Sequence, residues 1–207
     1  MSVASKFIPY KVKTFFKKFR KFNAVNNLDR KLLKYLNFKY GFYIECGAND
    51  GINQSNSWYF DKYNNWKGIL IEPIPRLFKE LKKNRNCKNI FVNKCLVSKK
   101  YNKDHIYITD KNLASKIEKN SSLKVKASTL NKILKENNAP KIINLFSLDV
   151  EGYELEVLKG INFSEYKFEF ILIETNKIIK LKQYLQNKNY FLIKRLSDGD
   201  FLFKFIK

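Results

Sequence analysis

Residues 42–51 read Phe42-Tyr43-Ile44-Glu45-Cys46-Gly47-Ala48-Asn49-Asp50-Gly51. The first half is a short apolar run, typical of a strand buried on both faces of a parallel sheet. Gly47 follows directly, and a glycine there lets the chain turn sharply and lets the backbone approach a ligand. Gly51 would permit close packing where the next helix begins. The pattern predicts a strand, a ligand-binding turn and a helix, although a plain strand-to-helix turn would have the same pattern.

Four more apolar runs follow along the chain. They cover residues 68–73, 89–93, 142–149 and 168–174. Segments with helical periodicity lie around and between them, over residues 55–63, 75–84, 129–137, 153–159 and 178–187. Strands that alternate with helices predict an α/β fold with a doubly wound, parallel sheet.

The C-terminal part has a different pattern. Two apolar runs, 190–195 and 201–205, flank Ser197-Asp198-Gly199-Asp200, and Asp-Gly between such runs is a hairpin signal. Added to the five earlier strands, this antiparallel hairpin predicts a mostly parallel, seven-stranded sheet. Residues 98–127 are polar, with weak strands near 105–109 and 123–127. We interpret them as an insertion at the sheet edge that contributes to a substrate lid. His105, the only histidine, lies there, and a lone histidine is more often structural than catalytic.

Residues 1–40 form a basic N-terminal extension ahead of one domain over residues 41–207. From Pro9 onward, the apolar residues have helical spacing, with Lys and Arg between them. These apolar residues are Val12, Phe15, Phe16, Phe19 and Phe22. A basic amphipathic helix can lie on an anionic membrane, so residues 6–22 are a candidate for peripheral membrane contact. The alternative is that its phenylalanines pack on the domain. A second helix is expected over residues 29–36.

The composition limits the domain count and leaves the partner open. A chain of 207 residues, 44% hydrophobic, can bury one sizeable core. Its formal net charge of +22 favours polyanionic partners such as nucleic acid or an anionic membrane. Most of the basic residues are Lys, however, and Arg is the residue suited to planar phosphate recognition. Coding bias toward A/T-rich codons would also produce a chain rich in Lys, Asn, Ile, Phe and Tyr.

The cysteines and the lengths of the apolar runs indicate in which cellular compartment the protein lies. Cys46, Cys87 and Cys95 are an odd set without paired spacing, which predicts neither a disulfide framework nor a zinc site. No apolar run approaches the ~20 residues that span a bilayer, and no signal peptide is evident. We therefore expect a cytoplasmic protein, with peripheral attachment to the inner membrane face as the second possibility.

A second motif indicates a nucleoside ligand. Glu72 ends the 68–73 run about 20 residues after Gly51, where an acid can bind both hydroxyls of an adenosine ribose. A dehydrogenase would carry the pyrophosphate-binding pattern Gly-x-Gly-x-x-Gly, but the second glycine position is Asn49 here. S-adenosylmethionine has no phosphates. Polar residues at 45, 49, 50 and 53–56 can bind its amino-acid end, so we favour it over NAD.

Three carboxylates follow the 142–149 run, at Asp149, Glu151 and Glu154. Ligands of doubly wound sheets bind outside the carboxyl ends of the strands, so these side chains should lie beside the cofactor turn. Methyl transfer to a hydroxyl requires removal of its proton, and a positioned carboxylate can act as general base. We therefore predict Asp149, Glu151 and Glu154 as catalytic residues. The alternative for Glu154 is an acid at a helix start, stabilised by the helix dipole.

Glu174 and Asn176 follow the fifth run. Together with Asp149 they could form an all-oxygen Mg²⁺ site that orients an acceptor hydroxyl. The alternative is that Glu174 and Asn176 line the substrate cleft or cap the next helix. The sequence leaves both open.

Several motifs together resemble the FkbM-type methyltransferases. They are residues 41–51, 54–57, 66–73, 129–131, 148–160 and 200–203, in order over roughly residues 28–205. The resemblance implies a class I, Rossmann-like, S-adenosylmethionine-dependent O-methyltransferase acting on hydroxyls of sugars, glycans or polyketides. It implies cofactor contacts from Glu45, Gly47, Asn49 and Glu72, and places Asp149, Glu151 and Glu154 around the reacting centre. The full set of cofactor contacts that we predict is Glu45, Gly47, Ala48, Asn49, Gly51, Ser55, Glu72, Pro73 and Asp149.

The chain departs from the family pattern at two positions, and two other functions are considered as alternatives. Asn131 stands where the family usually has Asp, and Ser57 where it often has Thr. We expect a small-molecule or glycan hydroxyl as the methyl acceptor. An RNA or DNA methyltransferase is favoured by the charge, but the chain has no Asn/Asp-Pro-Pro-Tyr motif and no recognisable RNA-binding module. A non-catalytic binding protein that keeps the fold is the third hypothesis.

Overall fold

The computed structural model describes residues 17–109 and 122–207. Seven strands form its main sheet: β1 (Phe42–Cys46), β2 (Lys67–Ile71), β3 (Ile90–Val92), β7 (Ile142–Leu148), β8 (Lys167–Glu174), β9 (Tyr190–Arg195) and β10 (Asp200–Phe205). Their order is β3-β2-β1-β7-β8-β10-β9. β10 runs antiparallel to β8 and to β9, whereas the other neighbouring strands are parallel. The predicted α/β fold, its mostly parallel seven-stranded sheet and its C-terminal hairpin are confirmed.

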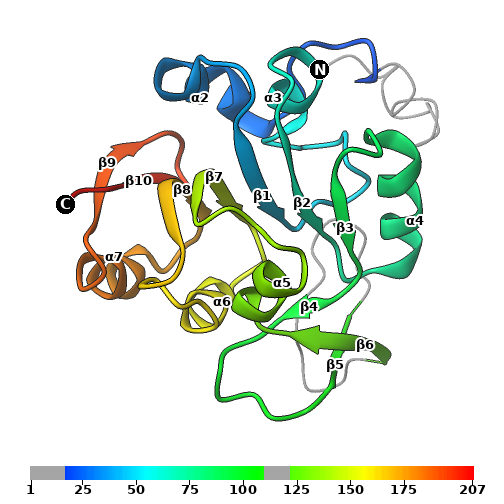
Figure 1. Ribbon diagram of the computed structural model, residues 1–207, viewed down its shortest axis with the longest axis vertical. Coiled ribbons are helices and arrows are strands. Elements are labelled where there is room, and N and C mark those ends of the chain that lie inside the picture. The colour runs from blue at the N-terminus through cyan, green and yellow to red at the C-terminus, as the bar shows by residue number, and fades with distance from the viewer. Residues whose placement is uncertain (1–16, 110–121) are drawn as a thin grey trace.

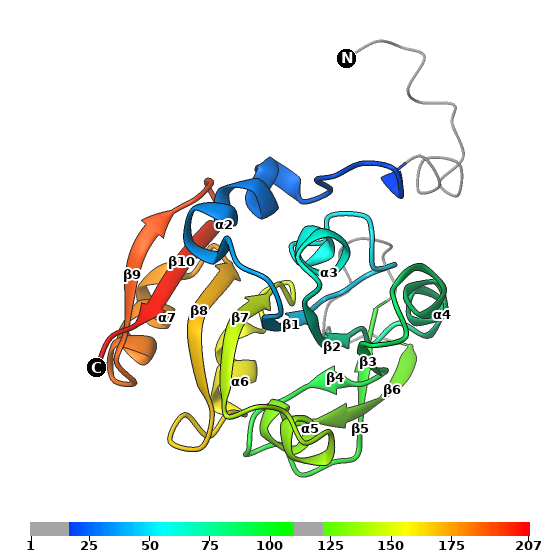
Figure 2. The same cartoon turned by 45° about the horizontal axis from the view of Figure 1, so that its top comes forward.

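Helices cover both faces of this sheet (Figure 1). They are α2 (Leu28–Leu36), α3 (Trp58–Tyr63), α4 (Pro75–Asn84), α5 (Leu130–Glu136), α6 (Glu154–Lys159) and α7 (Ile178–Gln186), with a short 3₁₀ turn η2 (Val25–Asn27) before α2. Figure 2 shows α2 and α3 on one side of the strands and α6 and α7 on the other. Two apolar clusters, one per face, therefore hold the layers together.

β1 shows why its sequence is apolar at successive positions. Tyr43 packs into the cluster beneath α2 and α3, while Ile44 and Cys46 pack into the cluster beneath α5, α6 and α7. Every residue of this strand is buried. A central parallel strand has no solvent-facing side, so it needs an unbroken apolar run rather than alternation.

The helix starts follow local rules, with one difference from the sequence-based prediction. α4 begins at Pro75, whose missing N–H costs nothing in a first turn. The Thr129 side chain accepts a hydrogen bond from the Lys132 N–H and caps α5. α3 begins at Trp58 rather than at Ser55, because the Ser55 and Ser57 hydroxyls and the Asn56 N–H donate to Glu45 of β1 and hold these residues outside the helix.

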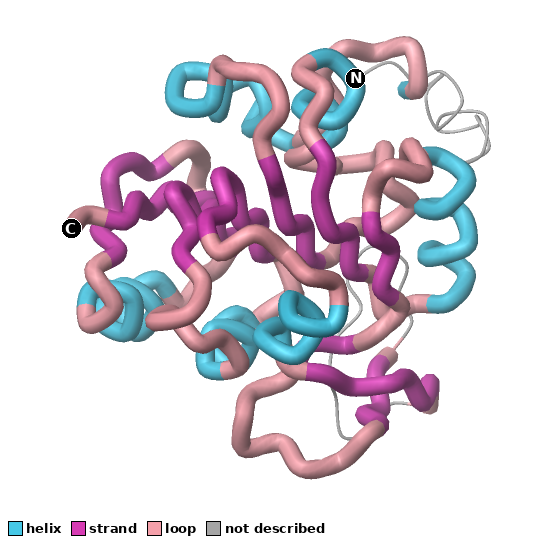
Figure 3. Tube along the Cα trace, in the orientation of Figure 1, coloured by secondary structure: helices cyan, strands magenta, loops and turns pink. Residues whose placement is uncertain are grey.

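A second, three-stranded sheet is formed by β4 (Cys95–Leu96), β5 (His105–Ile108) and β6 (Leu123–Ser128), in the order β4-β6-β5. It lies below the main sheet in Figure 3. The two strands expected within residues 98–127 are therefore present, but they pair with each other and with β4 rather than with the edge strand β3. Ile106 and Ile108 pack there against Ile74 and Leu77 at the start of α4. The His105 side chain is exposed.

Most of the predicted amphipathic helix, residues 6–16, lies outside the described residues. Phe22 stacks on Tyr59 of α3, with ring centroids 4.9 Å apart, so this end of the extension packs on the domain. Phe19 is 73% exposed. In the part of the chain that the structure describes, no helix is both long and apolar enough to cross a membrane.

Candidate functional site

A cleft opens at the carboxyl ends of β1, β2 and β7. The strand order reverses between β1 and β7, which is where ligands of doubly wound sheets bind. The cleft is partly open to solvent, and polar and apolar groups both line it. Six of the predicted cofactor residues line it: Glu45, Gly47, Asn49, Glu72, Pro73 and Asp149.

Gly47 joins the three strand ends. Its N–H and that of Ala48 donate to the Ile71 carbonyl of β2, both at 3.1 Å. Gly47 has φ +78°, and a Cβ atom there would lie 2.0 Å from the Asp149 carbonyl oxygen. No other residue fits this position without moving the backbone, because the clash is with main-chain atoms.

Glu72 lies against the same turn. Its carboxylate is buried and accepts hydrogen bonds from the Asn49 N–H and the Ile74 N–H, each at 2.8 Å. The Asn93 amide donates to the main-chain carbonyls of Glu72 and Pro73. The two sequence motifs, the glycine turn and the distant acid, are thus in contact.

Three predicted cofactor residues do not line the cleft. Ala48 packs into the apolar cluster beneath α3. Gly51 (φ +82°) packs closely against α4 rather than against the helix that follows it, since a Cβ atom would lie 2.7 Å from Leu81 and 2.8 Å from Arg85. The Ser55 hydroxyl bonds to Glu45. These residues shape the turn behind the cleft.

Glu45 lines the cleft but is already bound by the chain. Its carboxylate accepts from the Ser55 and Ser57 hydroxyls and from the Asn56 N–H, at 2.6–2.9 Å for the closest contact of each. The carboxylate is 4% exposed. Glu45 therefore organises residues 55–57, and its own capacity for a cofactor contact is small.

Asn56 supplies a group suited to a ligand. Its amide nitrogen donates to the Ser147 hydroxyl at 3.0 Å, and both residues line the cleft. Its Oδ1 atom is buried and has no hydrogen-bond partner among the residues that the structure describes. An unsatisfied buried acceptor costs about 1–3 kcal/mol, and a ligand ammonium would satisfy it. The residues present therefore fit the amino-acid end of S-adenosylmethionine.

Sequence reasoning missed several residues of the cleft. Lys94, Cys95 and Leu96 come from β4 and the residue before it, and Ile108 comes from β5. Nothing in their local sequence marks them, because only the docking of the small sheet brings them to the cleft. Burial raises the pKa of Cys95 to about 12, so its thiol stays protonated and forms an apolar wall.

The predicted catalytic carboxylates lie on the rim, where a second pocket adjoins the cleft. Asp149, Glu151 and Tyr153 line both pockets, and Glu154 and Glu174 line the second. Glu154 is buried at the first position of α6, and its carboxylate accepts the Gly152 N–H at 2.6 Å.

Asp149 and Glu174 form a hydrogen-bonded pair. Burial and the neighbouring charge of Glu174 raise the pKa of Asp149 well above its usual range. Burial, together with the charge of Asp200, also raises the pKa of Glu174. The pair therefore holds a proton at a higher pH than isolated carboxyl groups would.

The suggested Mg²⁺ site is not supported. Within residues 17–109 and 122–207, no three His, Cys, Asp or Glu side chains are arranged to hold a metal ion. Glu174 is hydrogen-bonded to Asp149, and Asn176 is exposed at the second pocket. The remaining alternative, that Glu174 and Asn176 line a substrate cleft, agrees with their positions.

The methyltransferase FkbM domain model matches residues 45–203, which include the cleft and the strands behind it. The chain belongs to the FkbM methyltransferase family. A search of curated protein sequences gives no match.

Several solved structures are similar to this chain. The crystal structure of methyltransferase FkbM from Methylobacillus flagellatus KT superimposes with a TM-score of 0.53 at 11% identity, over 94% of this chain and 59% of that protein. The methyltransferase domain of METTL16 gives 0.49 at 14% identity, covering 86% and 65%. The Methanococcus jannaschii fibrillarin pre-rRNA processing protein gives 0.48 at 13%, covering 81% and 67%. This FkbM-family chain spans less than two thirds of the first two proteins. The superposition on the Methylobacillus flagellatus protein shows the class I, Rossmann-like methyltransferase fold.

Proposed function

We propose that this protein is an S-adenosylmethionine-dependent O-methyltransferase that methylates a hydroxyl of a sugar, in a glycan or glycolipid. One observation supports this most directly: Asp149 lies where the cofactor cleft meets the second pocket. A general base has to reach both the reacting methyl group and the acceptor hydroxyl, and a residue shared by two pockets can do so.

The cleft offers different groups to the two ends of the cofactor. Glu72 would accept hydrogen bonds from the ribose hydroxyls, and Ile71, Leu77 and Ile108 line an apolar part. Asn56 would accept a hydrogen bond from the amino group. When bound, S-adenosylmethionine supplies an electrophilic methyl group on a sulfonium.

Asp149 would remove the proton of the acceptor hydroxyl as its oxygen attacks the methyl carbon. The raised pKa of Asp149 makes it a stronger base than an exposed carboxylate once it is ionised. Glu174 can share that proton through the hydrogen bond between the two carboxyl groups. The rest of the rate enhancement would come from holding the acceptor in line with the methyl group.

The lining of the second pocket favours a neutral acceptor. It includes the carboxyl groups of Asp149, Glu151, Glu154, Glu174 and Asp198, against a single cation, Lys177. Carboxylates bind sugar hydroxyls well and repel phosphates. The acidic lining is therefore an argument against RNA or DNA as the acceptor, despite the net charge of +22.

The test is transfer of a labelled methyl group from S-adenosylmethionine to extracts of cell glycans and glycolipids. We expect alkali-stable label on a sugar, and about 10²–10⁴-fold less of it with Asp149→Asn. Label on nucleic acid alone would favour the second hypothesis. Unchanged biological function of folded Asp149→Asn and Glu151→Gln variants would favour a non-catalytic binding protein.

A further inference from the structure

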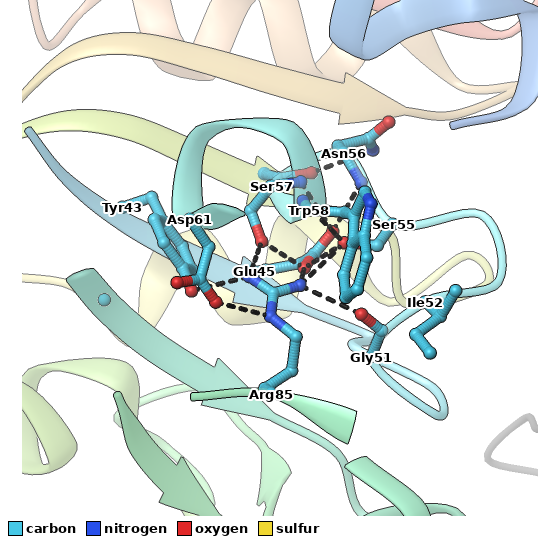
Figure 4. Close-up of polar contacts among 12 residues, drawn as sticks. Tyr43, Glu45, Gly51, Ile52, Ser55, Asn56, Ser57, Trp58, Asp61 and Arg85 are labelled. Carbon is cyan, nitrogen blue, oxygen red and sulfur yellow. Dashed lines mark hydrogen bonds and ion pairs between the residues drawn. The ribbon is translucent and has the colours of Figure 1, made fainter. Parts of the chain in front are cut away.

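Arg85, the residue after α4, lies wholly buried between α3 and the turn that follows β1 (Figure 4). A guanidinium has five N–H groups, and each of them has an acceptor here. Nε donates to Asp61, Nη1 to the Gly51 carbonyl and the Ser55 hydroxyl, and Nη2 to the hydroxyls of Tyr43 and Ser57, at 2.6–3.0 Å.

The same hydroxyls connect Arg85 to Glu45. Ser55 and Ser57 each donate to the Glu45 carboxylate and accept from Arg85, and the two charged groups are 3.7 Å apart. Lys88 balances the second carboxylate, Asp61, at 3.3 Å. Arg85 thus links two carboxylates next to residues 51–57, and a third buried carboxylate, Asp50, accepts the N–H groups of Ile52 and Asn53.

The side chains of residues 51–57 divide between Arg85 and the cleft. Gly51, Ser55 and Ser57 contact Arg85. Asn53, Gln54 and Asn56 lie between them in sequence and line the cleft. The bonds to Arg85 and Glu45 hold the main chain around Asn56, while Asp50 accepts the main-chain and side-chain N–H groups of Asn53.

We propose that Arg85 is a positioning residue that holds residues 51–57 in the shape that binds the amino-acid end of S-adenosylmethionine. This inference rests on the proposed function and assigns Arg85 no contact with the cofactor. Stability alone does not require such a cluster, because well-packed apolar residues in place of a buried ion pair are often as stable or more so.

The adenosyl end depends on other contacts. Glu72 is bonded to the N–H groups of Asn49 and Ile74, and the apolar wall comes from β2, α4 and the small sheet. None of these contacts involves Arg85. Loss of Arg85 should therefore weaken binding of the amino-acid part and leave binding of the nucleoside part.

Two ligands separate these parts in isothermal titration calorimetry. S-adenosylhomocysteine carries both, whereas 5′-methylthioadenosine keeps the nucleoside and the sulfur but lacks the amino acid. For Arg85→Lys, which has three donors instead of five, we expect S-adenosylhomocysteine to bind about tenfold or more weakly. We expect the affinity for 5′-methylthioadenosine to change by less than about twofold.

Asp29→Asn is the matched control. Asp29 is also fully buried and accepts main-chain N–H groups from Asn23, Ala24 and Arg30, away from the cleft. The Asp29→Asn substitution should lower the melting temperature without changing the affinity for S-adenosylhomocysteine or for 5′-methylthioadenosine. Circular dichroism shows whether Arg85→Lys folds. If it does not, Ser57→Ala, which removes one link between Glu45 and Arg85, is titrated with the same two ligands instead.

The selective loss of S-adenosylhomocysteine affinity in a folded variant would support the inference. Unchanged affinity for it, or an equal loss for both ligands, would overturn the inference while leaving the proposed function intact. A wild-type protein that binds neither ligand would overturn the proposed function itself.

Discussion

At the residue scale, Asp149 combines two properties that a base needs. It lies between two pockets, and burial together with the charge of Glu174 raises its pKa. The same environment opposes stability, because ionising two neighbouring carboxyl groups is unfavourable. A folded pKa above the unfolded value means that the folded state binds more protons, so its stabilising effect is present at low pH and fades as pH rises through the folded pKa.

This linkage predicts opposite pH effects on rate and on stability. The methyl-transfer rate should rise with pH as the pair loses its proton. Glu174→Gln removes the neighbouring charge, lowers the pKa of Asp149 and shifts the rate profile to lower pH. Asp149→Asn should raise the melting temperature more at pH 9 than at pH 5. A rate profile that Glu174→Gln leaves in place would contradict the assignment of Asp149 as base.

Gly47 and Gly152 allow two destabilising effects of an added side chain to be measured separately: backbone strain from a positive φ, and a steric clash of the Cβ atom. Both have positive φ, +78° and +98°, but a Cβ atom on Gly47 would strike the Asp149 carbonyl, whereas one on Gly152 would meet nothing within 4 Å. We predict that Gly152→Ala costs about 1 kcal/mol of unfolding free energy from backbone strain alone. Gly47→Ala should cost at least about 2 kcal/mol more and abolish S-adenosylhomocysteine binding. Denaturant unfolding measures the loss of unfolding free energy in each variant, and calorimetry measures ligand binding. An equal loss of unfolding free energy in the two variants would contradict the clash at Gly47.

At the scale of elements, the small sheet contributes one wall of the cleft. β4 supplies Cys95 and Leu96, and β5 supplies Ile108. Ile106, two residues earlier on β5, is buried in the same apolar cluster as Ile108 but does not line the cleft. The small sheet therefore has a packing role and a ligand-binding role that single substitutions can separate.

We predict that Ile106→Ala and Ile108→Ala each lower the unfolding free energy by about 2–4 kcal/mol. Only Ile108→Ala should also weaken 5′-methylthioadenosine binding, by roughly tenfold, because it removes apolar contact area inside the cleft. The two variants are compared by thermal unfolding and calorimetry. Equal affinities would mean that the small sheet does not contact the ligand.

At the scale of the whole molecule, charge is distributed unevenly. The chain carries +22 overall, while the second pocket is lined by carboxylates. Phe19, in the N-terminal extension, is 73% exposed. Its neighbours in the sequence are all basic: Lys17, Lys18, Arg20 and Lys21. A cationic segment with an exposed aromatic side chain suits an anionic lipid surface.

We therefore propose peripheral membrane contact through the N-terminal extension, and it can be measured by co-sedimentation with vesicles. The protein should bind phosphatidylserine-containing vesicles and not purely zwitterionic ones, and less at high salt. Phe19→Ala should weaken binding roughly tenfold, given the value of burying one aromatic side chain. Ile179→Ala is the control, because Ile179 is 72% exposed on α7. Salt-independent binding would contradict the proposal.

The sequence alone determined the succession along the chain of the main-sheet strands and their helices, the glycine turn and the acid that follows it. Those features are local or periodic: a doubly buried strand must be apolar throughout, and a turn with positive φ favours glycine. The approach of Glu72 to the turn could also be inferred, since the ends of adjacent parallel strands meet at one edge.

Only the tertiary structure showed that Arg85 bonds to residues 51–57 and that Ile108 reaches the cleft. These partners lie far apart in the chain, and nothing in the surrounding sequence distinguishes them from neighbouring Lys or Ile residues. Their chemistry depends on burial and on the distance between side chains, which are set when the layers pack and not by local sequence.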